Sequence, residues 1–281
     1  MPRGPTLHLV DASPYVFRGY YSIPPSVTAP DGRPVNAVHG FAAFLLRLIA
    51  EEAPTHLGVA FDRSLTTSFR NELYPDYKAQ RELPPPELEA QLCDCEELAA
   101  AVGAAVFVDE RYEADDLIAT LAARLRGRTS AIVVVTSDKD LAQLVDGRTT
   151  LLDFARQERY GPREVREKFG VEPGQVPDYL GLAGDAVDNI PGVKGVGAKT
   201  AVALLERFGD LDALYERLDE VGELELRGAR TLAAKLEAGR ELAFLSRELA
   251  TVARDAPARA ALGDLRLRRP DAARVAALCE R

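Results

Sequence analysis

Three aspartates, Asp11, Asp62 and Asp138, stand at or just beyond the ends of short apolar runs. A single aspartate in such a place is most simply a helix N-cap or a turn residue. If the runs are parallel strands, however, their carboxyl ends meet at one edge of a sheet, which is where ligands bind in open α/β folds. Three aspartates at three strand ends therefore indicate one shared acidic site.

Other acidic residues occur in tight clusters. Glu113, Asp115 and Asp116 fall within four positions, and Glu113 and Asp116 would share one face of a helix. An acidic first helical turn gains only about 0.3–1 kcal/mol per charge, whereas three crowded carboxylates repel one another unless a cation lies among them. With two further pairs, the candidate ligand set is Asp11, Asp62, Glu113, Asp115, Asp116, Asp138, Asp140, Asp185 and Asp188.

This set of donors favours a particular chemistry. Carboxylate oxygens without His or Cys select Mg²⁺ or Mn²⁺ over Zn²⁺. Two such ions about 4 Å apart could activate a water molecule and stabilise a leaving 3′ oxygen, so phosphodiester hydrolysis would need no protein nucleophile. The chain has 35 Lys and Arg against 44 Asp and Glu, a formal net charge of −9, which by itself disfavours nucleic acid as a partner. Acids that hold cations, however, attract phosphate through those cations.

The segments between the acids predict how they are positioned. After about residue 160 helix formers dominate, broken by Gly and Pro, so a mostly helical second part is expected, with a last helix near 271–280. The first half instead alternates, which predicts an α/β fold with a central, mostly parallel sheet flanked by helices. Strand-like runs occupy 7–10, 56–61, 104–108 and 131–135, and helical patterns occupy 37–51, 87–102 and 114–126.

A glycine turn, Gly195-Val196-Gly197, separates two helix-compatible segments. Such a turn permits a tight hairpin whose exposed backbone N–H groups can face a phosphate where the next helix begins. A plain connection between helices would be the default interpretation, but the flanking Lys194 and Lys199 favour phosphate binding. The Walker spacing of a nucleotide-binding loop is absent.

Composition and short motifs exclude several classes of protein. No apolar run approaches the ~20 residues that cross a bilayer, and residues 1–5 lack the apolar core of a signal peptide. Three cysteines do not suggest a disulfide framework or a zinc site, and the three histidines have no neighbours that suggest a catalytic triad. We expect a soluble, intracellular protein without a membrane partner.

Six strings carry a family resemblance: VDAS, AFDR, FRNELYPDYKAQR, YEADD, TSDKDLAQLV and GDAVDNIPGVKGVGAKTA, in this order. Over nearly the whole chain they resemble the 5′ nuclease (flap endonuclease) family, specifically the bacterial 5′-to-3′ exonuclease domain of DNA polymerase I. The resemblance implies a PIN-like nuclease core with a helix-hairpin-helix subdomain. It also implies a two-metal phosphodiesterase that acts on DNA with a 5′ flap, a nick or an RNA primer. Because the chain ends at Arg281 without a polymerase module, we expect a free-standing version.

The resemblance assigns roles residue by residue. The nine acids match the metal-site acids of the family, while Lys78 and Arg81 match basic residues that approach the scissile phosphate at the base of a helical arch. Phe17 and Arg18 occupy the place of a stacking aromatic residue and its basic neighbour, and stacking needs only the ring face. The glycine turn matches the helix-hairpin-helix, which often also holds K⁺. The further DNA contacts expected are Arg70, Lys194, Gly195, Gly197, Lys199 and Thr200.

Arg63 and Arg70 have a simpler alternative role, because each could pair with a surface acid such as Glu72 instead of a phosphate. The run of prolines at 84–86 is expected to begin a helix after the arch, with a simple linker as the alternative.

The expected organisation has three parts. Residues 1–165 form the nuclease core, with a helical arch at about 63–90. Residues 166–250 form the helical DNA-binding subdomain, with the helix-hairpin-helix at about 186–207, and residues 251–281 form a tail that packs on the core. We expect a monomer in the bacterial cytoplasm, associated with the nucleoid, and association with a DNA polymerase.

Three other functions fit parts of this pattern. A DNA-junction binder without activity would bind tightly in EDTA and cut nothing in magnesium, but the complete acid set argues against it. A PIN-type ribonuclease shares the acidic sheet edge but is normally shorter and lacks the helical hairpin domain. A phosphotransferase with Asp11 as nucleophile would want a second Asp two positions later, where Ser13 stands.

Overall fold

The computed structural model describes residues 4–63, 67–224 and 228–281. Within these residues the centre of the fold is a six-stranded sheet with the order β3-β2-β1-β4-β5-β6. All neighbouring strands are parallel except β5 and β6, so the predicted mostly parallel sheet is confirmed. The strands are β1 (Thr6–Asp11), β2 (His56–Asp62), β3 (Ala105–Asp109), β4 (Ala131–Val135), β5 (Thr149–Asp153) and β6 (Glu158–Tyr160).

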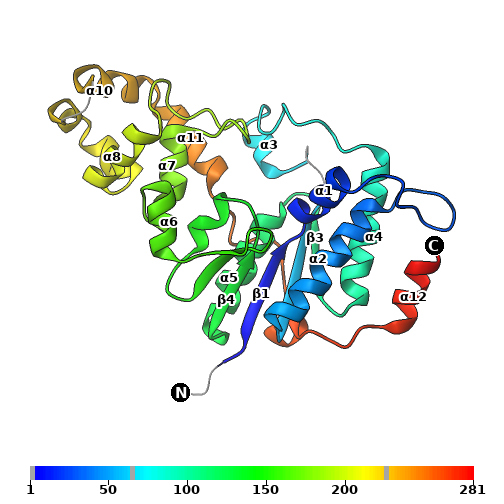
Figure 1. The fold of residues 1–281 in the computed structure, drawn as a ribbon. Helices are drawn as coiled ribbons and strands as arrows, with labels where there is room; N and C mark the ends of the chain where they lie inside the picture. Colours follow the sequence, from blue (N-terminus) through cyan, green and yellow to red (C-terminus); the bar gives the residue numbers. More distant parts are fainter. Residues whose placement is uncertain (1–3, 64–66, 225–227) are drawn as a thin grey trace.

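Helices cover both faces of this sheet (Figure 1). Side chains alternate along β1, so that Leu7 and Leu9 pack on the face covered by α5 while Val10 packs on the face covered by α1, α2 and α4. Burial on both faces explains why the central strands are almost continuously apolar. The helices of the first half are α1 (Ser13–Ser22), α2 (Asn36–Glu52), α3 (Phe69–Leu73), α4 (Pro86–Ala101) and α5 (Ala114–Leu125).

The sequence missed β5 and β6. Only two residues of β5, Leu151 and Leu152, are apolar, and β6 is a three-residue edge strand with two charged residues, so neither has the apolar run that revealed the other four. The four predicted strands are confirmed within one or two residues at each end.

The second half is helical, as predicted, and its apolar residues continue the core on one side of the sheet. The helices are α6 (Pro162–Phe169), α7 (Val176–Ala183), α8 (Ala198–Phe208), α9 (Leu211–Glu216), α10 (Ala229–Ala238), α11 (Arg240–Ala250) and α12 (Ala272–Glu280). In Figure 1 helices α6, α7, α8, α10 and α11 lie to the upper left of the sheet, whereas α12 lies on the right, near α4. Short 3₁₀ helices lie at Arg126–Arg128, Asp140–Leu144, Pro173–Gln175, Leu218–Glu223 and Leu262–Leu265.

The expected arch segment, 63–90, falls partly outside the described residues, at 64–66. In the described remainder, α3 is followed by turns and extended backbone up to α4. Pro86 begins α4, with Pro85 in the N-cap position, as the proline run predicted.

The chain after α11 returns to the core. Leu267 and Arg268 donate backbone hydrogen bonds to Thr55 and Gly103, and α12 packs against α4. Gly103 has φ +97°, and a Cβ there would lie 2.3 Å from the carbonyl oxygen of Arg268, so this crossing requires glycine. In the described part of the chain, no helix has the length and apolarity that a membrane span requires.

His8 on β1 is a buried titratable group remote from the acids. Its ring is 3% exposed, and its Nε2 lies 3.5 Å from the carboxylate of Glu52, which also accepts from Arg159 at 2.7 Å. Burial lowers the pKa of His8 and outweighs the opposite effect of Glu52. The pKa of His8 is lower in the folded than in the unfolded protein, so protonation favours the unfolded state. His8 therefore does not reduce the unfolding free energy above about pH 6.5, and it reduces that free energy progressively as the pH falls below this value.

Between pH 7.5 and 5.5 the wild type should therefore lose more unfolding free energy than a His8→Leu variant. The difference should be at most about 1.4 kcal/mol per pH unit, measured by urea denaturation. His39→Gln, at an exposed position on α2, is the control and should follow the wild type. Parallel curves for wild type and His8→Leu would contradict this account.

Candidate active site

The strand order brings the three strand-end aspartates together. β1 lies between β2 and β4, so Asp11 at the end of β1 has Asp62 on one side and Asp138, three residues beyond β4, on the other. Hydroxyl groups orient two of them: Thr136 Oγ1 donates to Asp11 at 2.8 Å, and Ser13 Oγ donates to Asp62 at 2.6 Å. The topology therefore brings the three aspartates to one edge of the sheet, as expected.

Asp115 joins this group from the start of α5, directly after Glu113 and Ala114, whose backbone N–H donates to Asp62 at 2.7 Å. Burial raises the pKa of Asp115 well above its usual range, and the charges of Asp138, Asp11 and Asp62 raise it further. Burial likewise raises the pKa of Asp11, with repulsion from Asp62 and Asp138 adding to it. The four carboxylates thus act on one another as one crowded anionic group.

Asp140 lies beside them, one residue beyond Lys139. Burial raises the pKa of Asp140 well above its usual range, and the charges of Asp138 and Asp188 add to this effect. Its Oδ1 atom is buried and has no hydrogen-bond partner in the described part of the chain. A buried acceptor without a donor, among carboxylates that repel one another, fits a bound cation. The residues present therefore suit hard divalent ions.

Basic side chains neutralise the acids on the side nearest the helical part. Lys78 Nζ lies 3.0 Å from Glu113 Oε1 and 3.8 Å from Asp188 Oδ2. Arg81 also pairs with Asp188, and Lys139 Nζ lies 2.7 Å from Asp185 Oδ2.

As they stand, no three His, Cys, Asp or Glu side chains among the described residues are placed to hold an ion. Burial alone would raise the pKa of Glu113, but the charges of Lys78 and Arg70 leave that pKa below its usual value.

Asp116 and Arg70 have other roles than those predicted. Asp116 is 0% exposed, and both of its oxygens accept from the Arg70 guanidinium at 2.8 Å. The backbone N–H groups of Ala253 and Glu113 also donate to it, at 2.8 and 3.1 Å. With these four donors the carboxylate is satisfied by protein groups, so Asp116 is a structural residue and not a metal ligand.

Arg70 is 2% exposed, and its guanidinium also donates to the carbonyl oxygens of Leu249 and Thr251. A buried side chain cannot contact DNA, which corrects the predicted role. Glu72, the alternative partner, pairs instead with Arg111. Arg63 pairs with Glu96.

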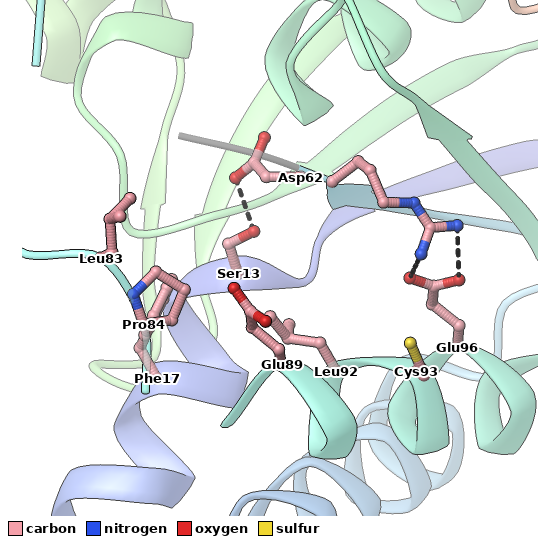
Figure 2. A pocket seen from close by; sticks show the side chains of 10 residues that line it. Ser13, Phe17, Asp62, Leu83, Pro84, Glu89, Leu92, Cys93 and Glu96 are labelled. Carbon is pink, nitrogen blue, oxygen red and sulfur yellow. Dashed lines mark hydrogen bonds and ion pairs between the residues drawn. The ribbon is translucent and has the colours of Figure 1, made fainter. Parts of the chain in front are cut away.

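A cleft of about 400 Å³ opens beside Asp62 (Figure 2). Phe17, Leu83, Pro84 and Leu92 give it an apolar side, and the hydrogen-bonded pair of Ser13 and Asp62 lies at its polar end. Phe17 therefore lies where a ring could stack on a base close to the acids.

Arg18 lies elsewhere. It is exposed and lines a separate groove with Arg47 and Phe154. The sequence indicated neither Leu83 nor Leu92 as part of a site, because only the tertiary structure brings α4 and the segment before it to the same cleft as Phe17.

The glycine turn lies between α7 and α8, as predicted. Gly195 has φ +85°, Gly197 is the N-cap of α8, and Val196 is buried beneath them. Lys194 and Lys199 are exposed on either side, and Thr200 in the first turn of α8 is half-buried. The first N–H groups of a helix have no acceptor within it, so this end can receive a phosphate.

Lys235 of α10 is a basic residue of the turn that the sequence did not reveal. A Cβ placed on Gly195 would lie 3.5 Å from Lys235 Nζ, so three lysines surround the turn. Forty residues separate Lys235 from Gly195 along the chain, and only the packing of α10 brings them together.

Comparisons with known proteins agree with this architecture. Residues 6–170 match the family model described as 5′-3′ exonuclease, N-terminal resolvase-like domain, and residues 171–273 match 5′-3′ exonuclease, C-terminal SAM fold.

The chain is 45% identical over 250 residues to DNA polymerase I of Pseudomonas aeruginosa, which covers 89% of this chain and 27% of that protein. It is 40% identical over 277 residues to DNA polymerase I of Bacillus caldotenax, covering 97% of this chain and 31% of that protein. The chain thus spans less than a third of the length of these relatives.

Two solved structures share the fold. T5 5′-exonuclease with bound divalent zinc ions has a TM-score of 0.69 at 24% identity, over 87% of this chain and 89% of that one. The catalytic core of Rad2 in complex with DNA substrate has a TM-score of 0.63 at 15% identity, over 98% and 86%.

Proposed function

Because this chain belongs to the 5′-3′ exonuclease family, we propose that it hydrolyses phosphodiester bonds near the 5′ ends of DNA with the help of divalent cations. The observation that carries the proposal is the group of buried and half-buried, mutually repelling carboxylates at the sheet edge, with Lys78 and Arg81 beside it. Hydrolysis at a phosphate needs both: anionic ligands for cations, and positive side chains facing the reacting group.

The site would hold two Mg²⁺ or Mn²⁺ ions. One or both ions would be held by the acids of the sheet edge: Asp11, Asp62, Asp115, Asp138 and Asp140. The other three acids, Glu113, Asp185 and Asp188, lie on the side of the helical part. When bound, such ions supply charge neutralisation, an activated water and stabilisation of the leaving 3′ oxygen. We also propose K⁺ at the turn between α7 and α8, because the resemblance of this turn to the helix-hairpin-helix implies it.

The remaining residues would bind and orient the substrate. Lys78 and Arg81 offer positive charge to the scissile phosphate, to which they can turn from Glu113 and Asp188. Phe17 would stack on a base next to that phosphate, within the cleft beside Asp62. The lysines and N–H groups of the turn would hold the duplex by its backbone, without reading its sequence.

The substrates we propose are DNA with a 5′ flap, a nick or an RNA primer, cut near the junction to release 5′-phosphate products. Such activity belongs to replication or repair, which would place the protein at the nucleoid in the cytoplasm. We propose that the protein acts there as a monomer. The similarity to part of DNA polymerase I makes a DNA polymerase the protein partner we propose.

The test is a labelled 5′-flap duplex incubated with the protein in magnesium, in manganese and in EDTA. Cleavage near the junction with either metal ion, and none in EDTA, is the expected result. Tight binding without cleavage in both metals would indicate a DNA-junction binder instead. Cleavage of single-stranded RNA with none of the flap would indicate a PIN-type ribonuclease.

Lys199 provides a separate test of the turn. A Lys199→Ala variant should bind flap duplexes of different sequence more weakly by the same factor, because the contact is to phosphate. The slope of log affinity against log salt should become shallower by about one. Arg128→Ala, in the 3₁₀ helix that follows the end of α5 opposite the acids, is the control and should bind like the wild type. Affinity that does not depend on salt would contradict this placement.

A further inference from the structure

Two loops more than a hundred residues apart in the chain are joined directly behind the acidic group. The backbone N–H of Lys78 donates to the carbonyl oxygen of Asp188 at 3.0 Å. Gln80 Nε2 donates to the carbonyl oxygens of Ala186 and Val187, at 3.1 and 2.9 Å. From the other side, Asn189 Nδ2 donates to the carbonyl oxygen of Asp76 at 2.6 Å. We call these contacts between residues 76–80 and 186–189 the clamp.

Each loop has a residue in the left-handed backbone region at the clamp. Lys78 has φ +55° and Asn189 has φ +56°, although neither is glycine. Asparagine tolerates this region, but a lysine is held there only when surrounding contacts determine the backbone. Besides the ion pairs of Lys78 and Arg81 with Asp188, the hydrogen bonds of Gln80 and Asn189 are side-chain contacts that hold the two loops in register.

The side chains that project from the clamp are those of the proposed reaction. Lys78 Nζ reaches Glu113 and Asp188, and Arg81 reaches Asp188. The backbone conformation of Lys78 sets the direction in which its side chain leaves the chain. The hydrogen bond from Lys78 N–H to the carbonyl oxygen of Asp188 fixes the backbone of Asp188 in the same way. A change in either loop would move a positive or a negative group relative to the acids.

We propose that Gln80 and Asn189 are positioning residues: they hold the clamp closed and thereby aim Lys78 at the reacting phosphate and keep Asp188 beside the acidic group. This inference rests on the proposed function. Gln80 is exposed and Asn189 is half-buried, and the polar contacts of both are to backbone carbonyls of the opposite loop. Their contribution is therefore to geometry, and substitution at these surface positions leaves the apolar core intact.

Neutral substitutions test the clamp without adding charge beside the acids. Gln80→Met keeps the length of the side chain and removes the donor, and Asn189→Gly keeps the left-handed backbone and removes the donor. Gln157→Met is a matched control, because Gln157 also has a left-handed backbone, φ +57°, and donates to a carbonyl oxygen, that of Phe154 at 2.9 Å, in the turn between β5 and β6.

The first measurement is hydrogen exchange at the Lys78 amide in the metal-free protein, which reports the clamp independently of activity. Both clamp variants should exchange this amide faster than the wild type and the control. Unchanged exchange would overturn the inference, because the side chains would then not hold the clamp.

The second measurement is flap cleavage in magnesium at saturating substrate. For both clamp variants kcat should fall, by up to about a hundredfold, because a small misplacement of reacting groups is costly. KM, DNA affinity in EDTA and the melting temperature should stay close to wild type. A general loss of structure would change these quantities together with kcat. Faster exchange with unchanged kcat would overturn the positioning role of Gln80 and Asn189 but would leave the proposed function standing. A wild type that cuts no 5′-ended substrate would refute the proposed function, and with it the role of the clamp in that reaction.

Discussion

An Asp138→Ala variant is expected to lose at least about a hundredfold in the rate of flap cleavage in magnesium. Substitution of residues that merely support a metal ligand commonly costs 10–100-fold, so loss of a central carboxylate should cost no less. Asp138 adds to the charge that raises the pKa of Asp11 and Asp115, which places it at the centre of the acidic group. Asp185→Ala, on the side of the helical part, should also lose activity.

Binding and stability distinguish this effect from unfolding. The Asp138→Ala variant should keep its affinity for the flap in EDTA, where cations contribute nothing to binding. In EDTA it should melt at or above the temperature of the wild type, because it has lost a carboxylate that its neighbours repel. Asp255→Ala, at an exposed position, is the control. An active Asp138→Ala/Asp185→Ala double variant would refute the assignment of the acidic group as the metal site.

An Arg70→Met variant is expected to lose about 3–5 kcal/mol of unfolding free energy. The substitution leaves the fully buried Asp116 carboxylate without its cation and removes a donor from the carbonyl oxygens of Leu249 and Thr251. A buried charge left alone is far more costly than the same charge in water. Urea denaturation measures the difference.

A surface ion pair provides the comparison for Arg70. Arg111 pairs with Glu72 at 2.8 Å, with side chains 58% and 62% exposed, and Arg111→Ala should cost less than about 1 kcal/mol. Removing both buried charges, as in Arg70→Met/Asp116→Leu, should restore part of the stability that Arg70→Met alone loses. A loss for Arg70→Met no greater than for Arg111→Ala would contradict the structural role.

If Arg70→Met loses the predicted unfolding free energy, Arg70 holds three parts of the molecule together. It lies on α3, its carboxylate partner lies in the first turn of α5, and its carbonyl partners lie at the end of α11. The start of α5 also carries Asp115, so the pair fixes the acidic group relative to the helical part without contacting substrate.

Local patterns in the sequence were enough to predict four strands of the six-stranded sheet and the place of its acids. Central strands buried on both faces must be almost continuously apolar, and β1, β2 and β4 have that pattern; the half-buried edge strand β3 is apolar as well. Once the strands are parallel, an aspartate that follows one of them can lie only at the carboxyl edge. The convergence of Asp11, Asp62 and Asp138 follows from that rule.

The tertiary structure alone decided which acids belong to the site. Asp115 and Asp116 are adjacent in the sequence, but neighbouring positions on a helix point about 100° apart, so one faces the carboxylates and the other faces Arg70. The partner that distinguishes them lies 46 residues away.

The lysine that α10 brings to the glycine turn and the clamp at Lys78 likewise depend on contacts between distant segments. Periodicity records which face of an element is apolar, but the pairing of individual polar groups is set only when the elements pack.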